Sequence, residues 1–364
     1  MHLIKKLLNR YFWTFPFLIL TAWSTPFFSQ SYSTAFLTLK NGLEYGGLKF
    51  KDAVFLTENT YFDNTLYRQE FDDELDLLVH LVKMHEKSDS LIYKGKDLAK
   101  IKTNSAMFRT LTDTTIALFY DTAYYVFMPY RYDFDDIFGS KDWSNMFVTK
   151  LLRTRKGNCH SLPYLYKILA DELGVRAYLS LSPNHTYIKQ KAEKGGWYNT
   201  ELTSASFPID AWLMASGYIS LQAVQNGIYL DTLSEKESIA LCVLDLAQGY
   251  NHKYPDNDGK FVIECCDLAL KHFPDYVNAI LLKAETHLKQ LQAMQKEMKY
   301  AYLKEVTTIP DGKVKWDEMN SLYMQLYKLG YRQMPEQMYV EWLTSLKTEK
   351  EKYSNKNAPG ATKD

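Results

Sequence analysis

The sequence predicts an α+β fold, in which a helix that bears a cysteine packs on an antiparallel sheet and a C-terminal α-helical region follows. The sheet is indicated by short β-like segments that begin at Val175, His185 and Trp197 and are separated by turn residues. The helical region is indicated by apolar residues at helical spacing after Leu230. A chain of 364 residues has room for about two or three domains with cores of their own.

The start of the cysteine-bearing helix is the most informative part of the chain. Cys159 follows Gly157 at the point where a loop enters a helix predicted over 161–173. The N–H groups at a helix start carry partial positive charge, which favours a thiolate. A helix packed on an antiparallel meander brings its own start beside the second and third strands. We therefore expect His185 and Glu201 to share one cleft with Cys159, although His185 follows Cys159 by 26 residues and Glu201 follows His185 by 16.

Cys159, His185 and Glu201 together supply the groups needed for acyl transfer through a thioester. The imidazole takes the thiol proton, and the carboxylate orients the imidazole. A cysteine taken alone is more often a small buried hydrophobe than a nucleophile, so the prediction depends on all three residues. Asn199 lies on the same strand face as Glu201 and is the alternative group for orienting the histidine. His160 is expected to pack beside Cys159 or to tune the site.

The oxyanion that forms during acyl transfer needs hydrogen-bond donors near the sulfur. The backbone N–H of Cys159 is one candidate, and the side chains of Asn145 and Asn158 are two more. The basic run at 153–156 is expected to be a solvated loop, with an increase of the local positive potential as the alternative.

These residues resemble the core of the transglutaminase-like superfamily, a branch of the papain-like cysteine enzymes. That family has Gly-x-Cys at a helix start, a later His, and a Trp four residues before an acidic residue, with Thr two residues further on. The matching positions lie within residues 142–230 and are Gly157, Cys159, His185, Trp197, Glu201 and Thr203. The chain departs from the family at Glu201, where Asp is usual, and after His185, where Thr-Tyr replaces the common Ala-Trp.

The resemblance implies a cysteine-dependent hydrolase, an amidase or peptidase that acts on a protein or peptide through a Cys159–His185–Glu201 triad. An amine acceptor in place of water would make the protein a cross-linking acyltransferase. A non-catalytic scaffold with the same fold is the alternative from another class. No cofactor is expected. Zinc is not expected either, because Cys159 has no Cys-x-x-Cys partner and the eight histidines are scattered.

The first 30 residues predict a secretory signal peptide. A basic start formed by Lys5, Lys6 and Arg10 precedes an interrupted apolar run over 11–23, and small polar residues follow. The apolar run is too short and too interrupted to predict a membrane span, so membrane contact is expected only through this segment. The protein is therefore expected in the periplasm or outside the cell. A formal net charge of zero gives no electrostatic argument for binding nucleic acid.

Export bears on the remaining cysteines, Cys242, Cys265 and Cys266. If Cys159 is a nucleophile, the odd number left means that at least one thiol stays unpaired. Adjacent helix residues point in different directions, so at most one of Cys265 and Cys266 can face Cys242. Burial in helix cores is expected ahead of such a disulfide.

Residues 31–141 are predicted to be a mixed α/β region that contributes to the core. The segments Ser33–Leu39 and Leu48–Leu56 are predicted to be extended, with a glycine turn between them. Phe71–Glu86 has apolar residues at helical spacing, and Tyr124–Met128 is predicted as either a strand or a helix. A further helix is expected over Trp143–Leu152, just before the cysteine loop.

Residues 231–346 are predicted to be helical and resemble tetratricopeptide repeats. The resemblance rests on the run Leu268–Pro274 and on the alanines at 279 and 284, because small residues let paired helices approach and proline ends a unit. Such repeats imply docking on the core or binding of a protein partner. The charged tail over 347–364 contains Gly and Pro and is predicted to be disordered.

Overall fold

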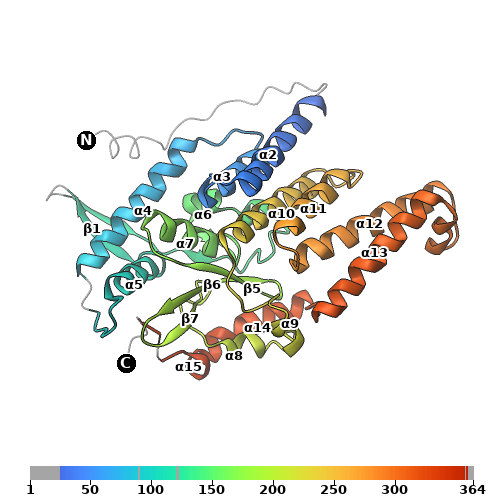
Figure 1. The fold of residues 1–364 in the computed structure, drawn as a ribbon. Helices are drawn as coiled ribbons and strands as arrows, with labels where there is room; N and C mark the ends of the chain where they lie inside the picture. Colours follow the sequence, from blue (N-terminus) through green and yellow to red (C-terminus); the bar gives the residue numbers. More distant parts are fainter. Residues whose placement is uncertain (1–24, 89–90, 120–122, 357, 360–364) are drawn as a thin grey trace.

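The computed structural model describes residues 25–88, 91–119, 123–356 and 358–359, and most of the predicted signal peptide lies outside this part of the chain. The fold is α+β, as predicted, with helices around small sheets (Figure 1). Within the described residues the strands form an antiparallel hairpin, a short parallel pair and a three-stranded antiparallel sheet. None of the described helices combines the length and the apolar character that crossing a membrane requires.

The part of the chain that the structure describes starts with α2 (Thr25–Tyr45), α3 (Phe50–Tyr61), α4 (Arg68–Ser88) and α5 (Leu98–Thr112). The prediction of a helix over 71–86 is confirmed by α4. The prediction of extended segments over 33–39 and 48–56 is wrong, because 33–39 lies in α2 and 50–56 lies in α3.

The reason lies in the spacing of the buried apolar residues of α2. They recur three and four positions apart, which is the period of a helix face rather than the alternation of a strand: Tyr32, Ala35, Leu39 and Leu43. The glycine turn between the two segments is present, since Gly46 and Gly47 have φ angles of 81° and 85°.

A hairpin of β1 (Thr115–Phe119) and β2 (Ala123–Phe127) follows, so the strand alternative at 124–128 is the correct one. β3 (Arg131–Tyr132) then pairs in parallel with β4 (Lys156–Gly157). Between these strands, the helix expected over 143–152 is split into the 3-10 helix η1 (Trp143–Met146) and α6 (Val148–Thr154).

A buried carboxylate explains this split. Glu58 of α3 accepts hydrogen bonds from the backbone N–H groups of Val148 and Thr149, at 2.7 and 2.8 Å, and so fixes the start of α6. At the other end of α6, Arg155 has a left-handed backbone with φ 57°. Its guanidinium lies 5.2 Å from the centre of the Tyr130 ring, so this member of the basic run packs on an aromatic ring.

The cysteine-bearing helix is α7 (Ser161–Glu172), and it is followed by β5 (Tyr178–Ser182), β6 (His185–Ala192) and β7 (Gly196–Thr200). The three strands form the predicted antiparallel meander, with Ser182 paired to His185 and Ile188 paired to Thr200. α7 contacts β5 and β6. On the other side of the sheet lie α8 (Asp210–Met214), α9 (Leu221–Gln225) and the late helix α14 (Glu336–Thr348) (Figure 1).

The helical region consists of α10 (Glu235–Lys253), α11 (Lys260–His272), α12 (Val277–Glu297), η2 (Leu303–Thr308), α13 (Pro310–Leu329) and α14. Successive helices from α10 to α13 pack on one another, as the paired-helix prediction requires. α10 also packs on α2 and α3, so the first helix of this region is part of the central body (Figure 1). Ser234 and Glu237 form a capping box at its start.

The prediction of a disordered tail over 347–364 is wrong for the residues that the structure describes. The chain makes a short helix, α15 (Lys350–Tyr353), and then runs beside residues 207–209. Ile209 donates its N–H to the Tyr353 carbonyl at 2.9 Å, and Asn355 donates to the Phe207 carbonyl at 2.8 Å. Backbone pairing thus holds a segment whose composition alone suggests disorder.

Candidate active site

Cys159 lies in the turn that starts α7, and neighbouring side chains fix its backbone. The Asn158 side-chain oxygen accepts hydrogen bonds from the N–H groups of His160 at 3.0 Å and Ser161 at 3.4 Å, which is helix capping. Gly157 must be a glycine, because a Cβ there would overlap Ser161 Oγ and come within 2.9 Å of Leu151 Cδ1. The sequence Gly-Asn-Cys therefore sets the cysteine at the positive end of a buried helix.

His185 and Glu201 come to this helix start from the sheet. His185 is the first residue of β6, and Glu201 follows the last residue of β7. Glu201 Oε2 lies 2.6 Å from His185 Nε2, and Glu201 Oε1 accepts the N–H of Thr203 at 2.8 Å. The Glu201 side chain is 3 % exposed and the His185 side chain is fully buried.

A tyrosine from the far end of the chain completes the contacts around the sulfur. Tyr339 of α14 donates its hydroxyl proton to Cys159 Sγ at 3.2 Å, and the same oxygen lies 3.0 Å from His185 Nδ1. The imidazole therefore turns Nδ1 toward the thiol side and Nε2 toward Glu201. Cys159 Sγ also lies 3.6 Å from the Asn184 carbonyl, which can accept the thiol proton. The structure thus brings Cys159, His185 and Glu201 together.

The surroundings favour the charged forms of all three groups. Burial would raise the pKa of the Cys159 thiol, but the hydrogen bond and charge of His185, the Tyr339 hydroxyl and the charge of His160 lower it overall. Burial would lower the pKa of His185, yet the charge of Glu201 and contacts with Cys159 raise it to about 10. Burial likewise opposes the charge of Glu201, and His185 with Thr203 lowers the pKa of its carboxyl. Thiolate, imidazolium and carboxylate therefore stabilise one another.

His160 follows Cys159 in the chain and has its own acidic partner. Its Nδ1 lies 2.8 Å from the Met146 carbonyl oxygen, and its Nε2 lies 2.9 Å from Asp245 Oδ1. Asp245 comes from α10, and its second oxygen accepts the Tyr164 hydroxyl at 2.9 Å. The contact between His160 and Asp245 thus ties α10 to α7 next to Cys159, and each side chain in it is 14 % exposed.

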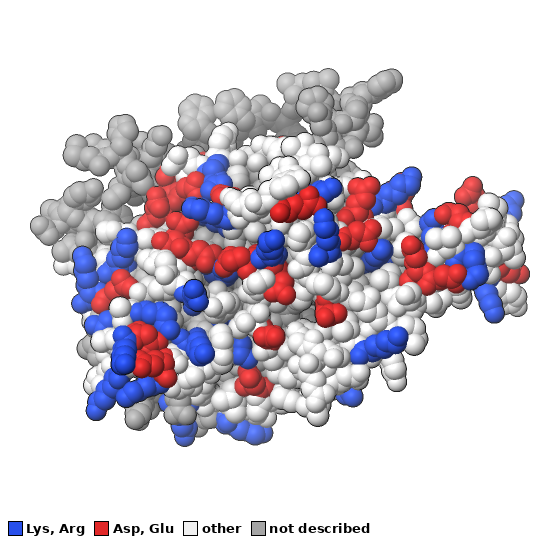
Figure 2. All heavy atoms as spheres, viewed as in Figure 1, with Lys and Arg blue, Asp and Glu red and all other residues white. Residues whose placement is uncertain are grey.

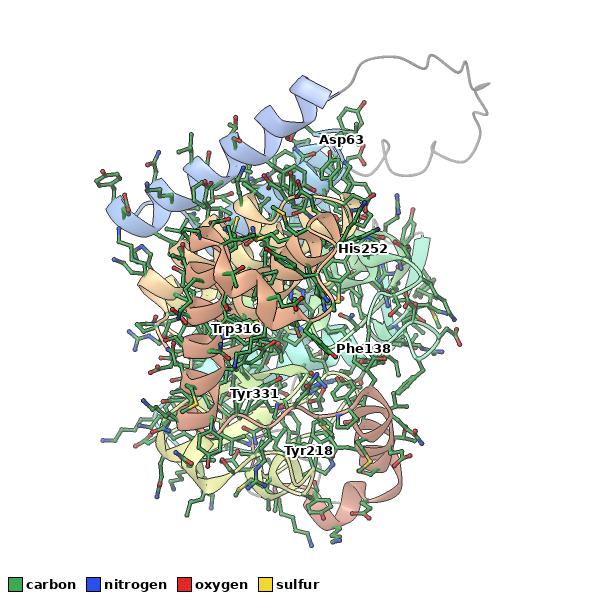
Figure 3. The ribbon with its side chains drawn as sticks, turned by 90° about the vertical axis from the view of Figure 1, so that its right-hand side faces the viewer. Asp63, Phe138, Tyr218, His252, Trp316 and Tyr331 are labelled. Carbon is green, nitrogen blue, oxygen red and sulfur yellow. The ribbon has the colours of Figure 1, made fainter. Side chains whose placement is uncertain are left out.

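Aromatic side chains cover the His185 ring. Trp212 of α8 and Trp342 of α14 stack with their ring centres 4.2 Å apart, and the Trp342 and His185 rings are nearly perpendicular with centres 5.4 Å apart. Phe138 packs on Tyr339, with ring centres 5.4 Å apart. In Figure 3, Phe138 lies between the helices above and the segments below that hold Tyr218 and Tyr331. The thiol side of the imidazole is thus covered mainly by α14, in which Tyr339 is fully buried.

Three amide side chains that the sequence offered for the site are engaged elsewhere. Asn199 donates to the Pro208 carbonyl at 3.0 Å and to Asp210 at 2.8 Å, so the prediction that it could orient the histidine is wrong. Asn145 donates to the Asp136 carbonyl at 2.6 Å. Asn158 donates to the Ile137 carbonyl at 3.1 Å. The amide groups of Asn145 and Asn158 are thus engaged with backbone carbonyls of the preceding loop, which leaves the backbone N–H of Cys159 as the predicted candidate that does not depend on an engaged side chain.

Trp197 of the family motif is 44 % exposed, and Lys191 lies over its ring. It lines a cavity of about 660 Å³ together with Gly174 and Arg176, at the end of α7 and of the sheet that is remote from the thiol. The motif residues therefore divide between the end that holds the thiol and an end whose cavity is lined by Lys100, Lys191 and Arg176.

Among the described residues, no group of three or more His, Cys, Asp or Glu side chains could hold a metal ion. Cys242, Cys265 and Cys266 are buried free thiols, so burial rather than the alternative disulfide is the arrangement in the structure. On the face shown in Figure 2, basic side chains are interspersed with acidic ones and form no continuous basic surface.

No protein-family model, curated protein or solved structure matches this chain.

Proposed function

We propose that the protein is an exported cysteine hydrolase with a transglutaminase-like core, which cleaves an amide of a protein or peptide through a thioester. The observation that supports this most is the hydrogen-bond chain from Cys159 through Tyr339 and His185 to Glu201. It joins a thiol at a helix start to a base and to a carboxylate that orients the base, which is the arrangement that nucleophilic catalysis by cysteine needs.

Proton positions along this chain are consistent with a charged resting state. If the sulfur is a thiolate, Tyr339 donates to it and accepts from His185 Nδ1–H, while His185 Nε2–H donates to Glu201. Every polar hydrogen then has an acceptor. In the neutral state, Tyr339 donates to His185 Nδ1 and the thiol proton points to the Asn184 carbonyl. The hydroxyl of Tyr339 thus suits both forms, so the proton shift between sulfur and imidazole costs no hydrogen bond.

The reaction follows from these positions. The Cys159 thiolate attacks the amide carbon and forms a sulfur–carbon bond, and the carbonyl oxygen takes the electron pair. The backbone N–H of Cys159 stabilises this oxyanion at the helix start. His185 then gives its Nδ1 proton to the leaving nitrogen, the carbon–nitrogen bond breaks and a thioester remains. His185, now neutral, takes a proton from water, the hydroxide attacks the thioester, and the acid and the thiolate are released.

The acceptor decides which kind of enzyme results. Water gives hydrolysis, and a primary amine gives cross-linking through the same thioester. We infer hydrolysis, because the imidazole is enclosed by Trp212, Trp342 and Tyr339, which leaves little room for a second protein chain beside water. In this proposal, Tyr339 leaves the sulfur when a substrate carbonyl arrives, because its hydroxyl occupies the approach to Sγ.

p-Nitrophenyl acetate tests the proposal without knowledge of the natural substrate. We expect the full chain to acquire one acetyl group, located on Cys159 by mass spectrometry of peptides, and then to lose it to water. Cys159→Ala must remain unmodified. Adding butylamine separates the two acceptors. Butylamine also reacts directly with the ester, so only N-butylacetamide formed in excess of that seen with Cys159→Ala reports transfer of the thioester to amines. Acetylation of Cys159 no faster than that of Cys242 would overturn the proposal and favour a non-catalytic scaffold.

A further inference from the structure

The two ring nitrogens of His160 both face atoms that can only accept a hydrogen bond. Nδ1 lies 2.8 Å from the Met146 carbonyl oxygen, and Nε2 lies 2.9 Å from a carboxylate oxygen of Asp245. A neutral imidazole carries one N–H and would leave one of these contacts without a proton. Both contacts are satisfied only if His160 is an imidazolium, so the geometry itself assigns it a positive charge.

Asp245, the partner of this charge, is fixed by a second hydrogen bond. Asp245 uses its other oxygen to accept the Tyr164 hydroxyl at 2.9 Å, and the Tyr164 ring lies against the His160 ring with centres 4.0 Å apart. The side chains of His160 and Asp245 are each 14 % exposed, so water screens the pair only weakly. Tyr164 lies one helical turn after His160, which makes the first turn of α7 part of the same network.

We propose that His160, held by Asp245 of α10, is a positioning residue whose positive charge at neutral pH stabilises the Cys159 thiolate. It adds to the positive end of α7, and it links the reactivity of the thiol to the helical region that supplies Asp245. This inference rests on the proposed function, because it concerns the same nucleophile. His160 takes no proton from the substrate and does not contact the reacting carbonyl.

The charges around His160 agree with this role. Burial would lower the pKa of His160, but the charge and hydrogen bond of Asp245, the Met146 carbonyl and Cys159 raise it to about 9. α3 contributes Glu58, whose buried carboxyl has its pKa raised to about 7 by burial. Tyr164 and Cys159 are the titratable neighbours on the segment of His160 itself. His160 therefore stays cationic below about pH 9, throughout the range in which a hydrolase at neutral pH would work.

Asp245→Asn tests the proposal with little change of shape. The amide can still accept from or donate to His160 Nε2 and can still bind the Tyr164 hydroxyl, but it no longer holds a proton on the ring. We expect His160 to become neutral near pH 7 and the thiolate to lose its stabilisation. The rate of Cys159 alkylation by iodoacetamide should then fall about tenfold at pH 6, which corresponds to a rise of about one unit in the thiol pKa, and should be unchanged at pH 9.5.

Asp171→Asn is the matched control. Asp171 is also on α7 and pairs with a lysine, Lys167, at 2.8 Å, but at the opposite end of the helix. Asp171→Asn changes the net charge by the same amount as Asp245→Asn and should leave the pH dependence of Cys159 alkylation unchanged. His160→Gln should reproduce the effect of Asp245→Asn, and the double variant should add nothing, because Asp245 acts through His160. Thermal unfolding of each variant reports whether the fold is kept.

The outcomes separate this inference from the proposed function. If the wild-type Cys159 is alkylated rapidly at pH 6 and folded Asp245→Asn has the same pH profile, the role of His160 is overturned and the hydrolase proposal stands. If His160→Gln and Asp245→Asn change the rate of Cys159 alkylation only at pH 9.5, His160 has a structural role and the inference fails. If the wild-type thiol reacts at pH 6 no faster than glutathione, the proposed function fails and this inference fails with it.

Discussion

Two histidines adjoin Cys159, and their partners give them different chemistry. His160 contacts a carbonyl and a carboxylate, which both only accept, so its two protons stay in place. His185 contacts a carboxylate on one side and the Tyr339 hydroxyl on the other. A hydroxyl can donate or accept, so His185 can lose and regain a proton on the side of the thiol. The comparison shows that the partner of a ring nitrogen, rather than closeness in sequence to the nucleophile, decides which histidine is the base.

Replacing each histidine in turn is the strongest test of the different roles of His185 and His160. We expect His185→Asn to lower the rate of Cys159 acetylation by p-nitrophenyl acetate about 10²- to 10⁴-fold at pH 7, which is the usual contribution of a general base. His160→Gln should lower it only about tenfold, by removing a charge. Stopped-flow release of nitrophenolate measures both. Equal losses in the two variants would mean that the assignment of base and fixed cation is wrong.

Glu201→Gln tests the role of His185 further, because it removes the negative charge that keeps His185 protonated. We expect a loss of about 10²-fold in the acetylation rate, at the lower end of the range for acid–base groups, since the imidazole and thiol remain. The amide of Gln can also donate to His185 Nε2 and fix the wrong tautomer. A rate within about threefold of the wild type would contradict the role of Glu201 as the orienting residue.

The pH dependence of stability gives an independent check on Glu201. The carboxyl has a lowered pKa, so its contribution is present above about pH 4.3 and is lost as the pH falls through the folded-state pKa. His185 has a pKa of about 10, so its contribution is complete below about pH 6.5 and is lost as the pH rises toward about 10. The difference in free energy of unfolding between wild type and Glu201→Gln should therefore be largest between about pH 4.3 and 6.5. Urea unfolding across this range measures it, and a difference that grows above pH 8 would contradict the pairing.

The part of the site that could be predicted from the sequence is the part with local signals. Glycine, capping residue and apolar periodicity mark the start of α7, and turn residues separate β5, β6 and β7. These signals place Cys159, His185 and Glu201 on neighbouring elements. The extended segments expected in 31–60 show the limit of this approach, because the spacing of buried residues in α2 was helical while the residue types also suited a strand.

Tyr339 and Asp245 could not be predicted from such signals. Tyr339 follows Cys159 by 180 residues, and Asp245 follows His160 by 85. Both lie on amphipathic helices, whose periodicity shows which residues face inward but does not show what they meet. A polar residue on a buried face is a hint, since it needs a partner. Only the packing of α10 and α14 on the core identifies that partner.

Tyr339 offers a smaller test, since its hydroxyl contacts both the sulfur and the base. Tyr339→Phe removes a hydrogen bond that favours the thiolate, and we expect alkylation by iodoacetamide at pH 6 to fall about three- to tenfold, which is the range for one hydrogen bond. Tyr339→Ala should instead speed the reaction of bulkier N-ethylmaleimide at pH 9.5, because the side chain that covers the sulfur is gone. Tyr327→Phe, on an exposed residue of α13, is the control. No change in either reaction would show that Tyr339 neither stabilises nor covers the thiol.

The last prediction concerns the other three thiols, Cys242, Cys265 and Cys266. Burial raises the pKa of each, and no histidine among the described residues lowers it again. Burial raises the pKa of Cys266 to about 12, with a further rise from Asp267, and raises the pKa values of Cys242 and Cys265 well above their ordinary range. Cys159 is half-buried beside two histidines and a hydroxyl donor. The other three thiols are fully buried among apolar helix residues, so burial leaves them protonated and unreactive. Native protein at pH 8 should therefore take up one iodoacetamide label, and protein unfolded in guanidinium chloride should take up four, matching the four cysteines of the chain. Labelling of Cys242, Cys265 or Cys266 in the native state at a rate near that of Cys159 would show that burial does not silence them, and that the histidines are not what distinguishes Cys159.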